Sequence, residues 1–156
     1  MCEIALKFGK FTEQEINQIK ERHSDGDGFF VIFRSERRGL IKSENGAQAI
    51  KRYLALNDKG IMFTLYHSRK ASAGAICYEN TQPFFDRSKN FVLAHNGTIS
   101  RQNLVFLAFA MNKMLYLKEY YSDSRILYQI IKDKKFSFSD EKIALEEIKK
   151  REKIWN

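Results

Sequence analysis

In this chain of 156 residues most strand-like hydrophobic runs lie before Asn96-Gly97 and a helical spacing predominates after it, and this division limits the fold more than any other feature. Before it, apolar residues occur in short alternating or continuous runs bounded by turn residues, which is typical of β-strands. After it, they recur three and four positions apart, which is typical of amphipathic helices. Strands in the first part and helices in the second predict an α+β protein.

Short strands are expected before Asn96-Gly97. Residues 2–8 alternate apolar and polar side chains, and residues 29–33 form a continuous apolar run after a turn cluster at 24–28. Gly60 opens a further apolar run over 61–66, and residues 91–94 form the last one.

Helices are expected where a capping signal precedes a helical spacing. Thr12 and Glu15 fit a capping box that predicts a helix over 13–22, and a second helix is expected over 46–56. The spacing after Asn96-Gly97 predicts a helix over 101–117, and Ser122 can cap another. A charged helical tail is expected over 134–156, so that residues 1–156 form a single domain.

Composition and charge pattern argue against several classes of function. The formal net charge is +8, but basic and acidic residues are interleaved, so a nucleic-acid partner is not expected. No apolar run approaches the ~20 residues of a membrane helix, and the start lacks a signal-peptide pattern. We therefore expect a cytoplasmic protein without a membrane segment. Its two cysteines are expected to be thiols, with Cys77 a buried small hydrophobic residue.

Cys2 directly follows the initiator methionine and has the clearest chemical potential in the chain. Removal of Met1 would place a thiol and a free α-amine on one residue, and an α-amine with a pKa of ~7.7–8.0 suits a general base. Retention of Met1 would block this chemistry. Cysteine at this position also occurs without function, so Cys2 alone does not define a site.

Four further segments follow Cys2 in the chain. They are residues 67–74 (HSRKASAG), 79–84 (ENTQPF), 94–99 (AHNGTI) and 122–124 (SDS). In this order, the set resembles the class II glutamine amidotransferases, the N-terminal-nucleophile glutaminases. The opening and the ENTQPF segment are most similar to the small stand-alone branch, which has no fused synthase domain. The resemblance extends over residues 2–124 and implies an αββα sandwich of antiparallel sheets between helical layers.

The resemblance also implies a set of catalytic and substrate-binding residues. Cys2 would be the nucleophile, and Asn96 and Gly97 would stabilise the oxyanion that forms when a thiolate attacks the glutamine amide. Arg69 would bind the substrate α-carboxylate, Asp123 its α-ammonium, and Ser72 would also contact the substrate. Taken alone, Asn96-Gly97 is more often an ordinary hairpin turn, and Arg69 could equally be a surface cation. Asp123 can complement a helix dipole and bind substrate at the same time.

The implied function is a glutaminase that hydrolyses glutamine or a γ-glutamyl compound through a Cys2 thioester and releases ammonia for a separate acceptor enzyme. No cofactor or metal is expected, because the three histidines (His23, His67, His95) lack a ligand spacing. The two histidines near the motifs, His67 and His95, are expected to orient loops.

Three departures from the family pattern support an alternative, a catalytically inactive descendant that binds or regulates. Lys70 stands where the family often has an aromatic residue, and Arg125 where it often has an acid. The chain is also short for the family. We therefore expect a sandwich truncated at its C-terminal side, covered by a partner chain or by self-association.

Overall fold

The computed structural model describes residues 2–20 and 24–132, which form helices and antiparallel strands. The elements are β1 (Glu3–Phe8), α1 (Glu13–Ile19), β2 (Asp27–Phe33), β3 (Arg38–Ser43), α2 (Gly46–Leu54), η1 (Asp58–Gly60), β4 (Ile61–Ser68), η2 (Tyr78–Asn80), β5 (Phe84–Asp86), β6 (Phe91–Leu93), α3 (Arg101–Ala110), η3 (Met114–Tyr116) and α4 (Asp123–Ile131).

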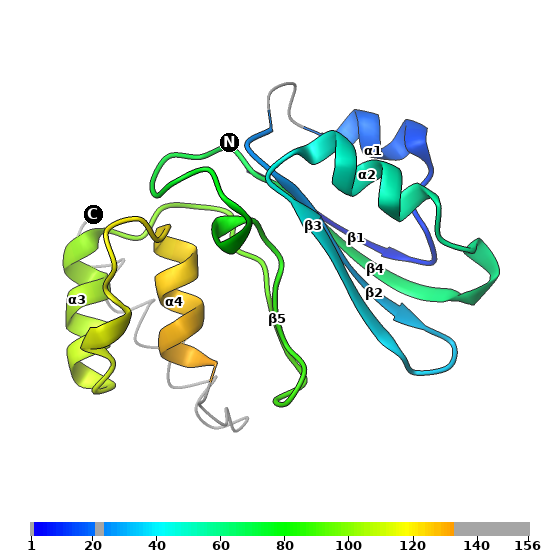
Figure 1. Ribbon diagram of the computed structural model, residues 1–156. Helices are drawn as coiled ribbons and strands as arrows, with labels where there is room; N and C mark the ends of the chain where they lie inside the picture. The colour runs from blue at the N-terminus through cyan, green and yellow to red at the C-terminus, as the bar shows by residue number, and fades with distance from the viewer. Residues whose placement is uncertain (1, 21–23, 133–156) are drawn as a thin grey trace, which may run out of the picture.

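A four-stranded sheet in the order β1-β4-β2-β3 forms the first half of the molecule. Helices α1 and α2 cover one of its faces (Figure 1). The alternation of side chains in β2 sends Phe29 into the core on this helical side, where its ring stacks between Tyr53 and Tyr66 at centroid distances of 4.0 and 4.6 Å. The three rings fix the distance between α2 and the sheet.

The opposite face of this sheet meets the second sheet, formed by β5 and β6. Phe30 of β2 packs against Phe85 of β5 with ring centroids 4.8 Å apart. Gly28 allows the segment before β5 to approach, because a Cβ at this position would lie 2.0 Å from the carbonyl oxygen of Gln82. The peptide bond between Gln82 and Pro83 is cis.

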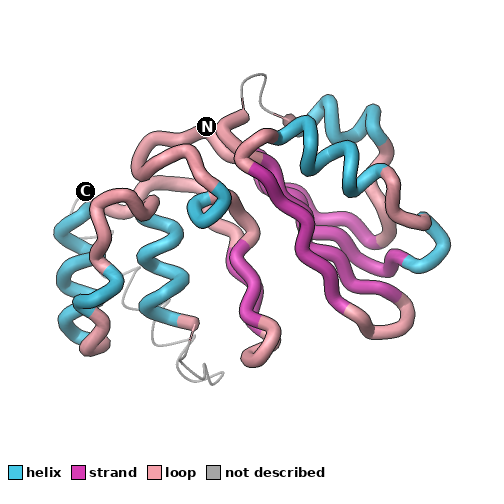
Figure 2. The backbone as a smooth tube through the Cα atoms, in the orientation of Figure 1, coloured by secondary structure: helices cyan, strands magenta, loops and turns pink. Residues whose placement is uncertain are grey.

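Helices α4 and α3 form the last layer, on the far side of the second sheet (Figures 1 and 2). Tyr128 of α4 contacts Phe84 of β5 at a centroid distance of 5.2 Å. The two helices share a second core built around four buried residues, Leu104, Ala108, Ile126 and Ile130. The order helix, sheet, sheet, helix is the αββα sandwich expected from the sequence.

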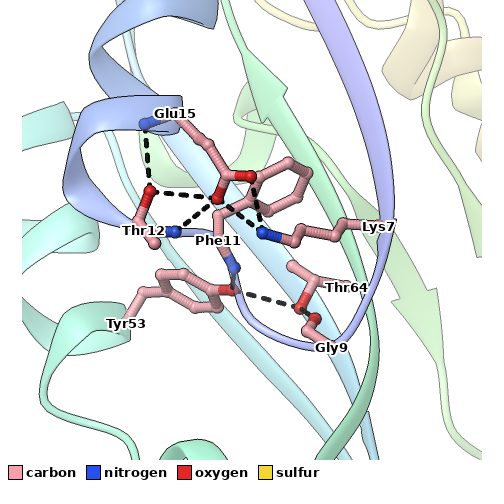
Figure 3. A network of polar contacts seen from close by, with 7 residues as sticks. All are labelled: Lys7, Gly9, Phe11, Thr12, Glu15, Tyr53 and Thr64. Carbon is pink, nitrogen blue, oxygen red and sulfur yellow. Dashed lines mark hydrogen bonds and ion pairs between the residues drawn. The ribbon is translucent and has the colours of Figure 1, made fainter.

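The capping box at the start of α1 is confirmed and belongs to a larger polar network (Figure 3). Glu15 accepts from the Thr12 backbone N–H at 2.8 Å, and its carboxylate pairs with Lys7 of β1 at 2.6 Å. The ion pair with Lys7 and the Thr12 backbone bond lower the pKa of Glu15 to about 2. Nearby, the Tyr53 hydroxyl accepts from the Phe11 backbone N–H at 2.7 Å, which ties α2 to the chain entering α1.

The second sheet covers only part of the inner face of the first. In β1, Ala5 points to the helical core, so Leu6 and Phe8 point to the opposite face. Their exposed fractions are 66% and 88%, although both are large apolar residues. In the described part of the chain, β5 and β6 are the strands of the second sheet, and they leave this edge uncovered.

Three predicted helices are longer than the observed ones. The helix predicted over 13–22 ends at Ile19, where Lys20 turns to an extended conformation. The helix predicted over 101–117 ends at Ala110, because Asn112 has a φ of 52° and Lys113 N–H donates to Ala108 O at 2.7 Å. This is a Schellman termination. The helix predicted over 46–56 ends at Leu54.

The four predicted strands are confirmed in position, with one correction to a bound, since β2 begins at Asp27, inside the predicted turn cluster. Strands β3 and β5 were not among the four. Ser122 caps α4 as predicted, with its Oγ accepting from Arg125 N–H at 3.2 Å. The predicted tail over 134–156 lies outside the described residues. Over the ranges that the structure describes, no helix has the length and apolar character to cross a membrane.

Candidate active site

Cys2 lies at the head of β1, beside the chain that leaves β4. The register pairs Glu3 with Ser68, so the residue before β1 faces the residues after β4. Lys70 N–H donates to the Cys2 sulfur at 3.3 Å, and the thiol lies 3.4 Å from Lys70 O. The antiparallel ladder thus fixes Cys2 against the segment that carries Arg69.

A small cavity lies at the Cys2 thiol. Its volume is about 20 Å³. A site of this size holds about one water molecule. The lining residues are Cys2, Arg69, Lys70, Ala71, Ser72, Ala73, Gln82, His95, Gly97, Ser122, Asp123 and Ser124.

Five of the six residues singled out in the sequence therefore meet at one cavity: Cys2, Arg69, Ser72, Gly97 and Asp123. They come from the start of β1, the segment after β4, the turn after β6 and the start of α4. The sixth, Asn96, is solvent-exposed and lies outside this set of lining residues.

Arg69 is buried, with an exposed fraction of 3%. Its guanidinium donates to the carbonyl oxygens of Ala73 at 3.0 Å and Ala75 at 3.2 Å, so it closes the loop that it begins. Burial lowers the pKa of Arg69 from its ordinary value, and Asp25 opposes that change. Since a guanidinium has five N–H donors, Arg69 keeps donors for a ligand.

Asp123 is the first residue of α4 and is also buried. Its Oδ2 accepts from Ile99 N–H at 2.7 Å, and its Oδ1 from Ser124 N–H at 2.7 Å. A carboxylate at this position complements the positive end of the helix dipole. Oδ1 also accepts from Ser124 Oγ at 3.3 Å, whereas Oδ2 has Ile99 N–H as its one donor among the described residues and retains acceptor capacity. The structural role therefore leaves Asp123 able to accept from a cation through Oδ2.

The turn that contains Gly97 is held by the side chain of Gln82. Gln82 Nε2 donates to His95 O at 3.2 Å, and His95 N–H donates to Gln82 Oε1 at 2.7 Å. The His95 ring is in turn tied to α4, with Nδ1 3.0 Å from Ser124 Oγ. Gly97 has a φ of 145°, a conformation that favours glycine.

His67 lies beneath the same turn and is fully buried. Its Nε2 is 3.3 Å from His95 O. Burial lowers the pKa of His67 to about 4, and the bond to His95 O acts in the opposite direction. His67 is therefore neutral near pH 7. Its Nδ1 has no hydrogen-bond partner among the described residues.

Sequence reasoning missed two residues that support the loop after β4. Asp25 accepts from Ala71 N–H at 2.7 Å. Asn80 is fully buried and joins this loop to the chain before α4, as its Nδ2 donates to Ala75 O at 2.8 Å. Each lies in a segment that the sequence marks, Asp25 in the turn cluster and Asn80 in the 79–84 motif, but neither motif reveals the distant partner.

Cys77 was expected to be a buried small hydrophobic residue and is instead half-buried. Across residues 2–20 and 24–132, no group of three or more His, Cys, Asp or Glu side chains could hold a metal ion.

An αββα sandwich with a cysteine directly before its first strand, on one cavity with an arginine and an aspartate, is consistent with the fold of the N-terminal-nucleophile hydrolases. Residues 1–109 match the family described as glutamine amidotransferases class-II, and the chain belongs to that family. The matched range contains Cys2, Arg69 and Gly97 but ends before Asp123. A comparison with curated proteins finds no match.

Proposed function

We propose that the protein is a glutaminase of the amidotransferase type, with Cys2 as its nucleophile. The observation that carries this proposal is the meeting of Cys2, Arg69, Gly97 and Asp123 at one cavity, from segments separated by up to 121 positions in the chain. Family membership supports an amidotransferase-type role in general. The ammonia would pass to a separate acceptor enzyme.

The proposed reaction begins once Met1 has been removed. The α-amine of Cys2, whose unperturbed pKa is ~7.7–8.0, takes the thiol proton, and the thiolate attacks the glutamine amide carbon. The Gly97 N–H stabilises the oxyanion, and the Asn96 amide joins it once this exposed side chain turns toward the cavity. The C–N bond breaks as the protonated amine gives the proton to the departing nitrogen. Ammonia departs, and the γ-glutamyl group remains as a thioester on Cys2. Water cleaves the thioester, so that glutamine and water become glutamate and ammonia.

Substrate binding requires the loop after β4 to move. A cavity of about 20 Å³ admits a group the size of water and cannot hold a whole glutamine. When the loop opens, Arg69 can exchange a carbonyl of its own loop for the substrate α-carboxylate, and Asp123 can accept from the α-ammonium. Ser72, which lies on this loop, would close over the substrate with it.

The test combines intact mass with labelling. Protein lacking Met1 is incubated with an electrophilic glutamine analogue that carries its reactive group at the γ-carbon, and ammonia release from glutamine is measured in parallel. We expect one adduct on Cys2, with ammonia released by the wild type and by Cys77→Ala but not by Cys2→Ala. Full activity in Cys2→Ala would refute the site, and processed protein that yields neither adduct nor ammonia would refute the function.

One observation favours a second candidate, a non-catalytic binding or regulatory protein of this family. The Arg69 guanidinium already donates to two carbonyls of its own loop, which is a stable closed state. Calorimetry with glutamine distinguishes the two proposals. Glutamine binding by processed protein without ammonia release would support the binding protein.

A further inference from the structure

A second and much larger cavity adjoins the Cys2 cavity. Its volume is about 460 Å³, which is within the range of small-molecule sites. Ala73 and Asp123 line both cavities and form the wall between them. The lining residues are Ala73, Gly74, Thr98, Ile99, Ser100, Arg101, Leu104, Glu119, Tyr121, Asp123 and Ile126.

The lining combines an apolar floor with charges of both signs. Leu104 and Ile126 are 1% exposed and belong to the core between α3 and α4. Arg101 and Glu119 are exposed and therefore lie toward solvent. Arg101 donates to Leu117 O at 3.0 Å, which holds it in place and leaves four of its five donors. An amino-acid residue with an apolar side chain and a free carboxylate matches the apolar floor and Arg101, and its carboxylate must lie on the Arg101 side of the cavity, away from Glu119.

We propose that the larger cavity binds the second residue of a peptide whose first residue is glutamine. This inference rests on the proposed function. If Asp123 accepts from the α-ammonium of that glutamine and the carboxamide reaches Cys2, the α-carbonyl lies at the wall between the two cavities. A residue attached there enters the larger cavity, where its side chain contacts Leu104 and Ile126 and its carboxylate meets Arg101.

The state of Arg69 supports a peptide over free glutamine. Free glutamine would place its α-carboxylate beside Arg69, two of whose five N–H donors are already held by the carbonyl oxygens of Ala73 and Ala75. A peptide bond replaces that carboxylate with a neutral carbonyl, and the charge moves one residue away, to Arg101. The reaction remains balanced, as Gln-Leu and water give Glu-Leu and ammonia.

Two dipeptides of the same composition provide the test. Gln-Leu keeps the glutamine α-ammonium, whereas Leu-Gln buries it in a peptide bond. Binding is measured by calorimetry on Cys2→Ala, which removes turnover, and ammonia release is measured on processed wild type. We expect Gln-Leu to bind at least about tenfold more tightly than Leu-Gln, Gln-Gly or free glutamine, the discrimination typical of an apolar subsite.

Arg101→Gln should raise the dissociation constant of Gln-Leu about tenfold through loss of a charge-assisted bond, and by more than it raises that of free glutamine. The matched control is Arg34→Gln, in the exposed turn between β2 and β3, which should leave both constants unchanged. Equal binding of Gln-Leu and Leu-Gln would overturn the inference. Ammonia release from free glutamine in the same protein would still support the proposed function. Selective binding of Gln-Leu without ammonia release from any substrate would uphold the cavity and refute the enzyme.

Discussion

Replacement of Asn80 should destabilise the protein by several kcal/mol. Its side chain makes three hydrogen bonds to backbone groups of other segments. Nδ2 donates to Ala75 O at 2.8 Å and to Tyr120 O at 2.7 Å, and Oδ1 accepts from Ser122 N–H at 2.9 Å. One buried amide therefore joins the loop after β4 to the chain that enters α4.

The magnitude follows from which of these backbone groups keep another partner. Ala75 O also accepts from Arg69, and Tyr120 O also accepts from Ala75 N–H at 3.1 Å. Ser122 N–H has Asn80 as its partner, and an unsatisfied buried donor costs about 1–3 kcal/mol. The carbonyls of Ala75 and Tyr120 would each lose one hydrogen bond, and the smaller side chain would leave a space. Asn80→Ala should therefore cost about 3 kcal/mol of unfolding free energy.

The assay is urea denaturation, with Asn57→Ala as the matched control. Asn57 is exposed and accepts one bond, from Lys59 N–H, so its loss should cost less than about 0.5 kcal/mol. Asn80→Asp provides a second variant, because it keeps the acceptor for Ser122 but turns a carboxylate oxygen toward two carbonyls. Its stability deficit should grow as pH rises. An Asn80→Ala cost equal to that of Asn57→Ala would refute the reasoning.

Three further predictions concern the core. Gly28→Ala should cost about 3 kcal/mol, because its Cβ would lie 2.0 Å from the backbone oxygen of Gln82, and a thermal melt measures the loss. The pKa of His67 is lowered to about 4, so the unfolded state binds more protons from pH 6.5 down to 4, and stability should fall by about 3 kcal/mol over that window. Tyr53→Phe leaves the buried Phe11 N–H without its hydroxyl partner and should cost about 1–2 kcal/mol in urea denaturation.

Each of these has a matched comparison. Gly60→Ala should cost far less than Gly28→Ala, since its Cβ would meet Phe33 at an ordinary 3.6 Å. His67→Gln should remove the fall in unfolding free energy between about pH 6.5 and 4. The same fall in the variant would show that other groups cause it. Tyr78→Phe, at an exposed ring, should leave stability unchanged where Tyr53→Phe lowers it.

The elements that the sequence predicted well depend on neighbours in the chain. The capping box of Thr12 and Glu15 and the cap at Ser122 use partners three positions away, so a local pattern is sufficient. Strand β3 was missed because its pattern is not apolar on its buried side. Lys42 is 7% exposed and lies 4.4 Å from the Tyr78 ring, and burial, together with the charge of Arg125, lowers its pKa to about 8.

The residues of the candidate site could be singled out because ordered motifs resemble a known family. Their geometry could not, since it depends on partners far apart in the chain. Asp25 and Ala71 are 46 positions apart, and Asn80 and Ser122 are 42 apart. The hydrogen bonds of Arg69 to the carbonyls of its own loop could not be predicted either. A motif specifies the residue type but not the groups that its guanidinium contacts.

The position of Cys2 on β1 has a consequence for how its reactivity is controlled. Strand β1 is an edge strand, paired with β4 alone among the described strands, and edge elements open locally at lower free energy than central ones. The position of the Cys2 thiol depends on the β1–β4 pairing, which is the pairing of this edge strand. The rate at which a thiol reagent modifies Cys2 should therefore follow the exchange of the β1 amide hydrogens with solvent. The modification rate of the Cys2 sulfur would then measure how often strand β1 separates from β4.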